Sequence, residues 1–183
     1  MSAHKLLEGV KVVELASFVA APTAGRMMAE MGADVIRVES TAGDPWRFYG
    51  ANCGLPITDE ENPLFDIYNL GKKDIQLNTK TPEGKEILFH LLDEADVFIT
   101  NNRLKSLVRS GLDYESLKDR FPKLIYGLVT GYGQTGPDVD APGYDGVAFF
   151  SRSGMLADMA EPSGYPASAP GCIGDGATGA ALF

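Results

Sequence analysis

The stretch VKVVELASFVAAPTAGRMMAEMGADVIRVE, residues 10–39, decides the fold class. Its first part, Val10–Leu15, is apolar and rich in β-branched residues, which is typical of a strand buried on both faces. The segment TAGRMMAEMGA carries three methionines at helical spacing, and Gly32 is placed as its C-cap. Asp34–Glu39 again has the pattern of a strand. The order strand, helix, strand predicts a βαβ unit.

The rest of the chain continues this alternation. Thr81, followed by Pro82 and an acid, is typical of a helix start, and an apolar stripe then runs to Ala95. We interpret Ser40–Asn62 as a polar excursion over the surface, residues 131–146 as loop, and the chain from Gly174 onward as the start of a helix. Alternating strands and helices predict an α/β fold with a Rossmann-like, mainly parallel sheet and flanking helices. The other predicted elements are strands at Lys73–Leu77, Asp96–Thr100 and Leu124–Val129 and a short helix at Tyr114–Arg120.

Composition narrows the class of protein. The 183 residues suffice for one domain with a core. Acidic residues number 25 against 16 basic ones, a net charge of -9, which argues against a nucleic-acid partner. There is no signal-peptide core and no apolar run of ~18 residues, so we expect a cytoplasmic protein without a membrane span. Cys53 and Cys172 have no metal or redox spacing, so we expect reduced thiols and no metal site.

Two G-x-G-x-x-G matches raise the alternative of a nucleotide-binding dehydrogenase. They cover residues 131–136 and 174–179. A dinucleotide fingerprint must follow a strand and open a helix. The first match leads into a loop, and the second lacks a good preceding strand. Glu39 occupies a position where a ribose-binding acid could lie, but an acid at a strand end is common. The dehydrogenase therefore stays open as a less favoured alternative.

The chain closes with PGCIGDGATGAALF, in which Asp175 is the one ionisable side chain, with no cation and no second acid beside it in the sequence. One interpretation makes Asp175 a helix N-cap. The other makes it a covalent nucleophile that small neighbours leave accessible, with adjacent N–H groups stabilising an oxyanion. The two interpretations are compatible. Because domains seldom end inside an apolar helix, we also expect the chain to be a fragment of a larger domain.

Several blocks, in the right order, resemble the class III CoA-transferases of the formyl-CoA transferase and carnitine CoA-transferase type. They are LEGVKVVELASFVAAPTAGRMMAEMGADVIRVE, NLGKKDIQLNTKTPEGKEIL, ADVFITN with Arg109 after it, LIYGLVTGYGQTGP, PGYDG and the pair Gly174-Asp175. The stretches ENPLFDIYNLGKK, TNNR and GYDGVAFFSRSG most resemble members that serve 2-hydroxy acids in amino-acid fermentation, such as phenyllactate or 2-hydroxyisocaproate CoA-transferases. The similarity runs from about Leu7 to the end of the chain.

The resemblance implies a mechanism and a set of contacts with coenzyme A as substrate. Asp175 would attack a donor acyl-CoA, forming an aspartyl–acyl anhydride and then an enzyme–CoA thioester, from which the acceptor acid takes CoA. No permanent cofactor is implied. Ser40 departs from members with Arg after the glutamate, which puts a phosphate contact there in doubt. The implied CoA contacts are Val19, Ala20, Leu77, Asn78, Thr79, Lys80, Asn101, Asn102, Arg103, Arg109, Gly143, Tyr144 and Asp145.

The same resemblance leaves a second enzyme open and sets the expected architecture. Related α-methylacyl-CoA racemases pair an acid with the His of a GHD motif, whereas this chain has Tyr144 in the His place. Because Tyr is a poor base at an α-carbon, the transferase is favoured over the racemase. A CoA-binding fragment without catalysis is a further alternative. Residues 1–183 would form the N-terminal part of the large domain of a two-domain, interlocked homodimer, and we expect little activity from them alone.

Overall fold

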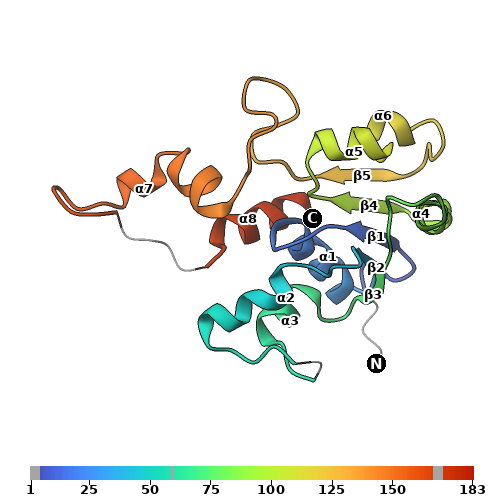
Figure 1. The fold of residues 1–183 in the computed structure, drawn as a ribbon, viewed down its shortest axis with the longest axis horizontal. Coiled ribbons are helices and arrows are strands. Elements are labelled where there is room, and N and C mark those ends of the chain that lie inside the picture. The colour runs from blue at the N-terminus through green and yellow to red at the C-terminus, as the bar shows by residue number, and fades with distance from the viewer. Residues whose placement is uncertain (1–4, 59, 167–170) are drawn as a thin grey trace.

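A computed structural model describes residues 5–58, 60–166 and 171–183. Its centre is a five-stranded sheet in the order β3-β2-β1-β4-β5, in which every neighbouring pair is parallel (Figure 1). The predicted α/β fold is therefore confirmed. In the described ranges, no helix combines the length and apolar character needed to cross a membrane. The strands are β1 (Lys11–Leu15), β2 (Asp34–Glu39), β3 (Lys73–Gln76), β4 (Val97–Thr100) and β5 (Ile125–Leu128).

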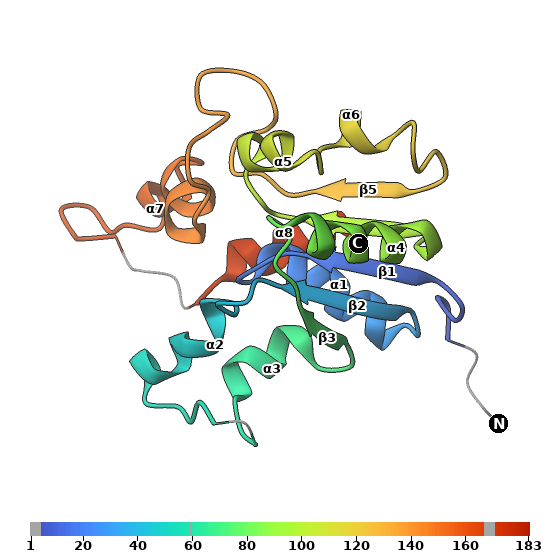
Figure 2. The same cartoon turned by 45° about the vertical axis from the view of Figure 1, so that its right-hand side comes forward.

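Helices cover both faces of the sheet. On one face, Val13 and Phe98 pack against the helices α4, α5 and α6. On the other face, Val12 and Ile99 pack against α1 and the end of α8. Figure 2 shows α1 and α8 on this side of the sheet from a second view. The helical segments are α1 (Ala20–Glu30), α2 (Trp46–Tyr49), the 3₁₀ turn η1 (Gly50–Cys53), α3 (Pro63–Asn69), α4 (Pro82–Glu94), α5 (Leu104–Ser110), α6 (Tyr114–Leu117), the π-helical turn η2 (Gly146–Ser151), α7 (Met155–Asp158) and α8 (Ile173–Leu182).

Elements with strong local signals lie where the sequence predicts them. The five strands fall within one residue of their predicted bounds. α4 begins as predicted, because the hydroxyl of Thr81 accepts a hydrogen bond of 3.2 Å from the N–H of Gly84. α1 begins earlier than predicted, at Ala20, since Pro22 is compatible with a first helical turn. α6 ends at Leu117, before the predicted Arg120.

The prediction of a surface excursion over residues 40–62 is confirmed only in part: most of the described residues are exposed, but the segment is helical in places and has buried anchors. Two short helical segments, α2 and η1, lie there, and the ring of Trp46 is buried with Val19 and Phe65. The indole N–H of Trp46 donates to the carbonyl oxygen of Leu64 at 3.0 Å. These contacts come from residues distant in sequence, so local composition did not reveal them. The helices α3, α5 and α7 and the turn η2 were also not predicted.

A row of charged side chains crosses the sheet on the face that α1 covers. In the register of the parallel strands, Glu14 of β1 lies beside Arg37 of β2, which lies beside Asp74 of β3. Arg37 is completely buried, and its guanidinium also pairs with Glu39 and Asp44. Its Nε atom lies 3.2 Å from Glu14 Oε1. Because an unpaired buried charge is very unfavourable, these partners fix the arrangement of the three strands.

Close packing of α8 on α1 depends on a glycine. A Cβ atom added to Gly179 would lie 2.3 Å from the carbonyl oxygen of Ala20 and 2.5 Å from the Cβ of Thr23. Real side chains do not approach this closely. Gly179 therefore lets the backbones of the two helices meet, whereas Gly176 in the same helix has open space around its Cα.

We predict opposite effects on stability for two Gly→Ala substitutions in α8. Gly179→Ala should lower the free energy of unfolding by about 1–3 kcal/mol, because the new methyl group overpacks the contact with α1. Gly176→Ala, the matched control, should raise it by about 0.5–1 kcal/mol through helix propensity. Urea unfolding measures both. Equal effects of the two substitutions would contradict the predicted role of Gly179.

Candidate active site

A pocket of about 620 Å³ lies beyond the carboxyl ends of β1, β4 and β5. The chain builds β1, β2 and β3 in one direction across the sheet and then returns to place β4 on the other side of β1. Ligands of open α/β sheets bind at such a switch point. Segments that follow the three strands line the pocket, together with residues from α2, η2 and α8. They include Ser17–Ala20, Asn101–Leu104, Val129–Gly131, Ala141–Gly146, Trp46, Phe149, Cys172 and Asp175.

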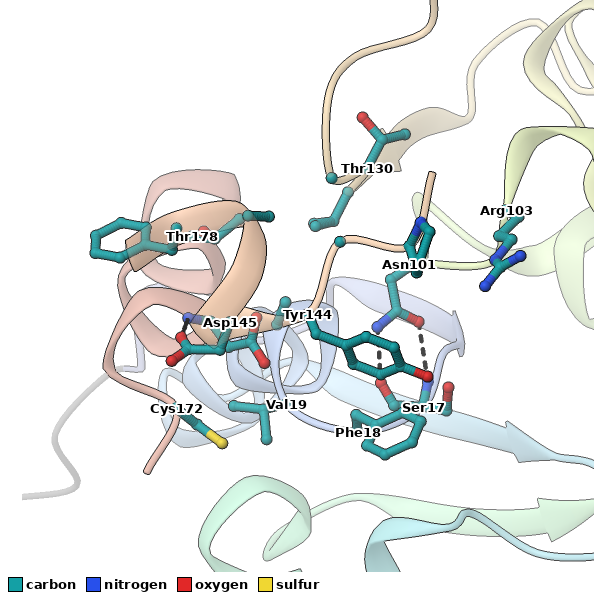
Figure 3. A pocket seen from close by; sticks show the side chains of 18 of the residues that line it. Ser17, Phe18, Val19, Asn101, Arg103, Thr130, Tyr144, Asp145, Cys172 and Thr178 are labelled. Carbon is teal, nitrogen blue, oxygen red and sulfur yellow. Dashed lines mark hydrogen bonds between the residues drawn. The ribbon is translucent and has the colours of Figure 1, made fainter. Parts of the chain in front are cut away.

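Asp175 lies in the first turn of α8 and is partly buried at the pocket wall. The prediction that Asp175 caps the helix is wrong. The N-cap residue is Cys172, and its side chain accepts no capping hydrogen bond. Instead, the N–H of Asp175 donates to Oδ1 of Asp145 at 2.7 Å, drawn as a dashed line in Figure 3. The N–H of Gly176 donates to the carbonyl oxygen of Cys172. These two N–H groups therefore already have acceptors, which weakens the expectation that they stabilise an oxyanion.

The surroundings of Asp175 make its carboxyl a weaker acid than usual. Burial, and then the negative charge of Asp145, raise the pKa of Asp175 to about 6. Burial and the two carboxylates likewise raise the pKa of the Cys172 thiol to about 11 and shift the pKa of Tyr68 upward. At neutral pH, Asp175 is therefore mainly ionised, whereas Cys172 and Tyr68 carry their protons. The sequence around Asp175 contains no second acid, but the fold places Asp145, thirty residues earlier in the chain, next to it.

The structure brings together one group of the residues predicted to bind CoA. These residues share the pocket with Asp175: Val19, Ala20, Asn101, Asn102, Arg103, Gly143, Tyr144 and Asp145. A second group does not line the pocket in the part of the chain that the structure describes. Leu77, Asn78, Thr79 and Lys80 follow β3 at the edge of the sheet, and Arg109 lies in the last turn of α5. A role for this second group in binding stays a prediction.

Asn101 uses its amide to hold the pocket wall together. Its Oδ1 accepts a bond of 3.0 Å from the N–H of Ser17, and its Nδ2 donates to the Ser17 carbonyl oxygen at 2.7 Å (Figure 3). The next residue back, Thr100, donates its hydroxyl to the carbonyl oxygen of Leu15 at 2.7 Å. The end of β4 is thus bonded to the end of β1, and Asn101 acts on the backbone of the neighbouring turn.

Sequence reasoning missed an aromatic wall in the pocket. The ring of Phe18 meets Tyr144 edge-on, with 6.3 Å between ring centroids, and lies 6.4 Å from Trp46. Trp46 in turn stacks on Tyr49 at 4.7 Å. Of these, only Tyr144 had been singled out. The available signal was the dense aromatic run WRFY at residues 46–49, in a segment interpreted as polar surface.

The glycine motifs do not take the positions that a dinucleotide site requires. Gly131 follows β5, but the chain then enters a loop, and Gly131 packs its backbone against that of Gly143. The residues 174–179 lie inside α8. Glu39 pairs with Arg37 and Arg47 and does not line the pocket. Among the residues that the structure describes, no group of three or more His, Cys, Asp or Glu side chains is placed to hold a metal ion.

Known proteins match this chain over nearly its whole length. The model of CoA-transferase family III matches residues 7–183. A cinnamoyl-CoA:phenyllactate CoA-transferase from Clostridium sporogenes is 49% identical over 93% of the chain and 41% of the relative. An (R)-2-hydroxy-4-methylpentanoate CoA-transferase from Clostridioides difficile is 45% identical over 97% of the chain and 44% of the relative.

A solved structure agrees with these sequence matches. The crystal structure of a CAIB/BAIF family protein from Brucella suis has a TM-score of 0.88 and 38% identity, and it covers 98% of this chain and 48% of that protein. The chain spans less than half the length of the curated relatives it matches. The family match, together with the identities to these relatives, shows that the chain belongs to CoA-transferase family III.

Proposed function

We propose that the protein containing this chain transfers coenzyme A from an acyl-CoA donor to a carboxylic acid, with Asp175 as the nucleophile. The observation that supports this most directly is the position of Asp175 at the wall of a pocket of about 620 Å³. Its carboxyl group is ionised at neutral pH and its pKa is raised, which favours nucleophilic attack on an activated acyl group. Family membership supports the same reaction class.

The proposed reaction needs only this carboxylate and the two substrates. A carboxylate oxygen of Asp175 attacks the donor thioester carbon, the C–S bond breaks, and CoA leaves as a thiolate, giving an aspartyl–acyl anhydride. The thiolate then attacks the aspartyl carbonyl carbon, which releases the donor acid and forms an aspartyl–CoA thioester. The acceptor carboxylate repeats these steps in reverse order and leaves as its CoA thioester, restoring Asp175. Asp145 keeps the N–H of Asp175 bonded and so orients its backbone.

The distribution of charge suggests how CoA lies in the pocket. In the view of Figure 3, Asp145 and Cys172 are at one end of the pocket and Arg103 is at the other. The CoA phosphates would lie toward Arg103, because a guanidinium binds phosphate oxygens well. The thioester would then lie toward Asp175. By the family resemblance, we also propose that the full-length protein is an interlocked homodimer acting on small-molecule substrates.

We predict that Asp175→Asn abolishes CoA exchange in the full-length protein, with a loss of about 10³-fold or more in kcat, because the amide is not a nucleophile. With acyl-CoA present, hydroxylamine or borohydride should trap a covalent adduct on the unsubstituted protein and none on the variant. Asp158→Asn is the matched control, since Asp158 is an exposed acid that also lies in a first helical turn. Normal exchange by the Asp175 variant would refute the proposed mechanism.

We further propose that the acceptor is a 2-hydroxy acid. The support is that the two clostridial relatives described above are named for phenyllactate and for (R)-2-hydroxy-4-methylpentanoate. We predict that kcat/KM is at least about tenfold higher for a 2-hydroxy acid than for the same acid without its hydroxyl. A site that hydrogen-bonds the hydroxyl would have unpaired polar groups when the analogue binds. Steady-state kinetics on matched acid pairs measures this ratio, and a ratio of one would exclude the proposed acceptor class.

Activity should decline as the pH falls below about 6, the pKa of Asp175, because the protonated carboxyl group does not attack. Asp145→Asn keeps an oxygen that can accept the N–H of Asp175 but removes the negative charge that raises its pKa. We therefore predict that the acid limb of kcat/KM moves to lower pH in this variant. The nearby Cys172 and Tyr68 have raised pKa values and stay protonated in this range. An unmoved limb would contradict the proposed coupling of the two carboxyl groups.

A further inference from the structure

The turn between β1 and α1 contains a bulky residue in an unfavourable backbone conformation. Phe18 has a φ of 61°, in the left-handed region that bulky L-residues rarely adopt. The turn also forms part of the pocket wall, since Ser17, Phe18 and Val19 all line it. Such strain persists only where the surrounding structure holds the residue in place. The contacts that hold Phe18 therefore also determine the shape of the pocket.

A buried carboxylate outside the pocket lining binds this turn. Both oxygens of Asp44 lie within hydrogen-bond distance of the N–H of Phe18, at 3.2 and 3.1 Å. Oδ1 also accepts a bond of 2.9 Å from the N–H of Trp46, and Oδ2 pairs with the guanidinium of Arg37. Asp44 is only 2% exposed. Three donors thus converge on two oxygens, an arrangement that an ionised carboxylate satisfies and a side-chain amide does not.

Asp44 is itself oriented by the core of the sheet. Its own N–H donates to Oε2 of Glu39 at 3.1 Å, and its partner Arg37 is held by charged groups on β1, β2 and β3. The residue before Phe18 is also held, because Asn101 bonds both the N–H and the carbonyl oxygen of Ser17 (Figure 3). The turn is therefore fixed from β4 through Asn101 and from the charged core through Asp44.

We propose that Asp44 is a positioning residue for the ligand pocket: it holds the left-handed turn at Phe18 and so keeps the pocket wall shaped for coenzyme A. Its carboxylate accepts the N–H of Phe18 and of the neighbouring Trp46, which places both rings in the wall. The choice of CoA as ligand rests on the proposed function. Asp44 lies outside the pocket lining, so it acts through the turn and not on the ligand.

The test compares two substitutions within the same charged network. Asp44→Asn removes the group that binds the turn, whereas Asp74→Asn removes a charge that also pairs with Arg37 but bonds nothing in the turn. Isothermal titration calorimetry measures the affinity of the full-length protein for CoA, and circular dichroism measures the folded fraction of each variant. We expect Asp44→Asn to raise the Kd for CoA by about tenfold or more, since small displacements in a site are costly. Asp74→Asn should leave it within about twofold.

A second pair of variants tests the same contact from the other side. Phe18→Pro removes the N–H that donates to Asp44, and its ring makes a positive φ impossible. Phe18→Ala keeps the N–H and can still adopt a positive φ, so it removes only the aromatic ring. The Kd should rise far more for Phe18→Pro than for Phe18→Ala. This pair decides the question if Asp44→Asn does not fold.

The outcomes separate the two proposals. If the unsubstituted protein binds CoA and folded Asp44→Asn binds it equally well, the positioning role of Asp44 is overturned. Equal losses for Phe18→Pro and Phe18→Ala would also overturn it. If the unsubstituted protein does not bind CoA, the proposed function fails, and the role of Asp44 toward CoA fails with it.

Discussion

The structure depends on one arginine that has no access to water. Arg37 lies in the middle of β2 with acids on the neighbouring strands in register, Glu14 on one side and Asp74 on the other. Removing one partner from a buried ion pair typically costs about 3–5 kcal/mol, because the remaining charge is left uncompensated. A shift of β1 by one residue would produce the same loss, since it turns the buried Glu14 to the other face. A shift of β3 would cost less, because Asp74 is exposed. The register of β1, β2 and β3 is therefore specified electrostatically as well as by apolar packing.

This charged row connects the core of the sheet to the pocket. It lies on the face that α1 covers, and its central Arg37 also pairs with Glu39 and Asp44, which lie at and beyond the carboxyl end of β2. The pocket opens beyond the same edge of the sheet, where the order of the strands reverses. Apolar contacts hold α8 against the same face, so Asp175 reaches the pocket from the far end of the chain. The sheet, the ion pairs and the last helix thus converge on one site.

The sequence predicted the elements whose signals are local. Runs of β-branched residues indicated the strands, and the Thr81 cap indicated the start of α4. It did not predict α2, because Trp46 forms its core with residues far away in the chain. α3 was not predicted although its start carries a local signal, the Asn62 cap followed by Pro63. The same limit applied to the candidate site: residues with a local motif could be predicted, and contacts between distant residues could not. Asp175 was recognisable from a motif, whereas Asp145 was expected near CoA but not as the acceptor of the Asp175 N–H, since thirty residues separate the two.

The second carboxylate is consistent with a nucleophilic role for Asp175, although it opposes the negative charge there. Burial, and then repulsion from Asp145, raise the pKa of Asp175 and with it the basicity of the oxygen proposed to attack. In the proposed reaction, acylation of that oxygen would carry its negative charge away on the CoA thiolate and so end the repulsion. The proposed acyl-enzyme would lack a repulsion that is present in the free enzyme, and this difference would favour its formation. A hydrogen bond of 2.7 Å from the N–H of Asp175 to Oδ1 of Asp145 holds the two residues next to each other.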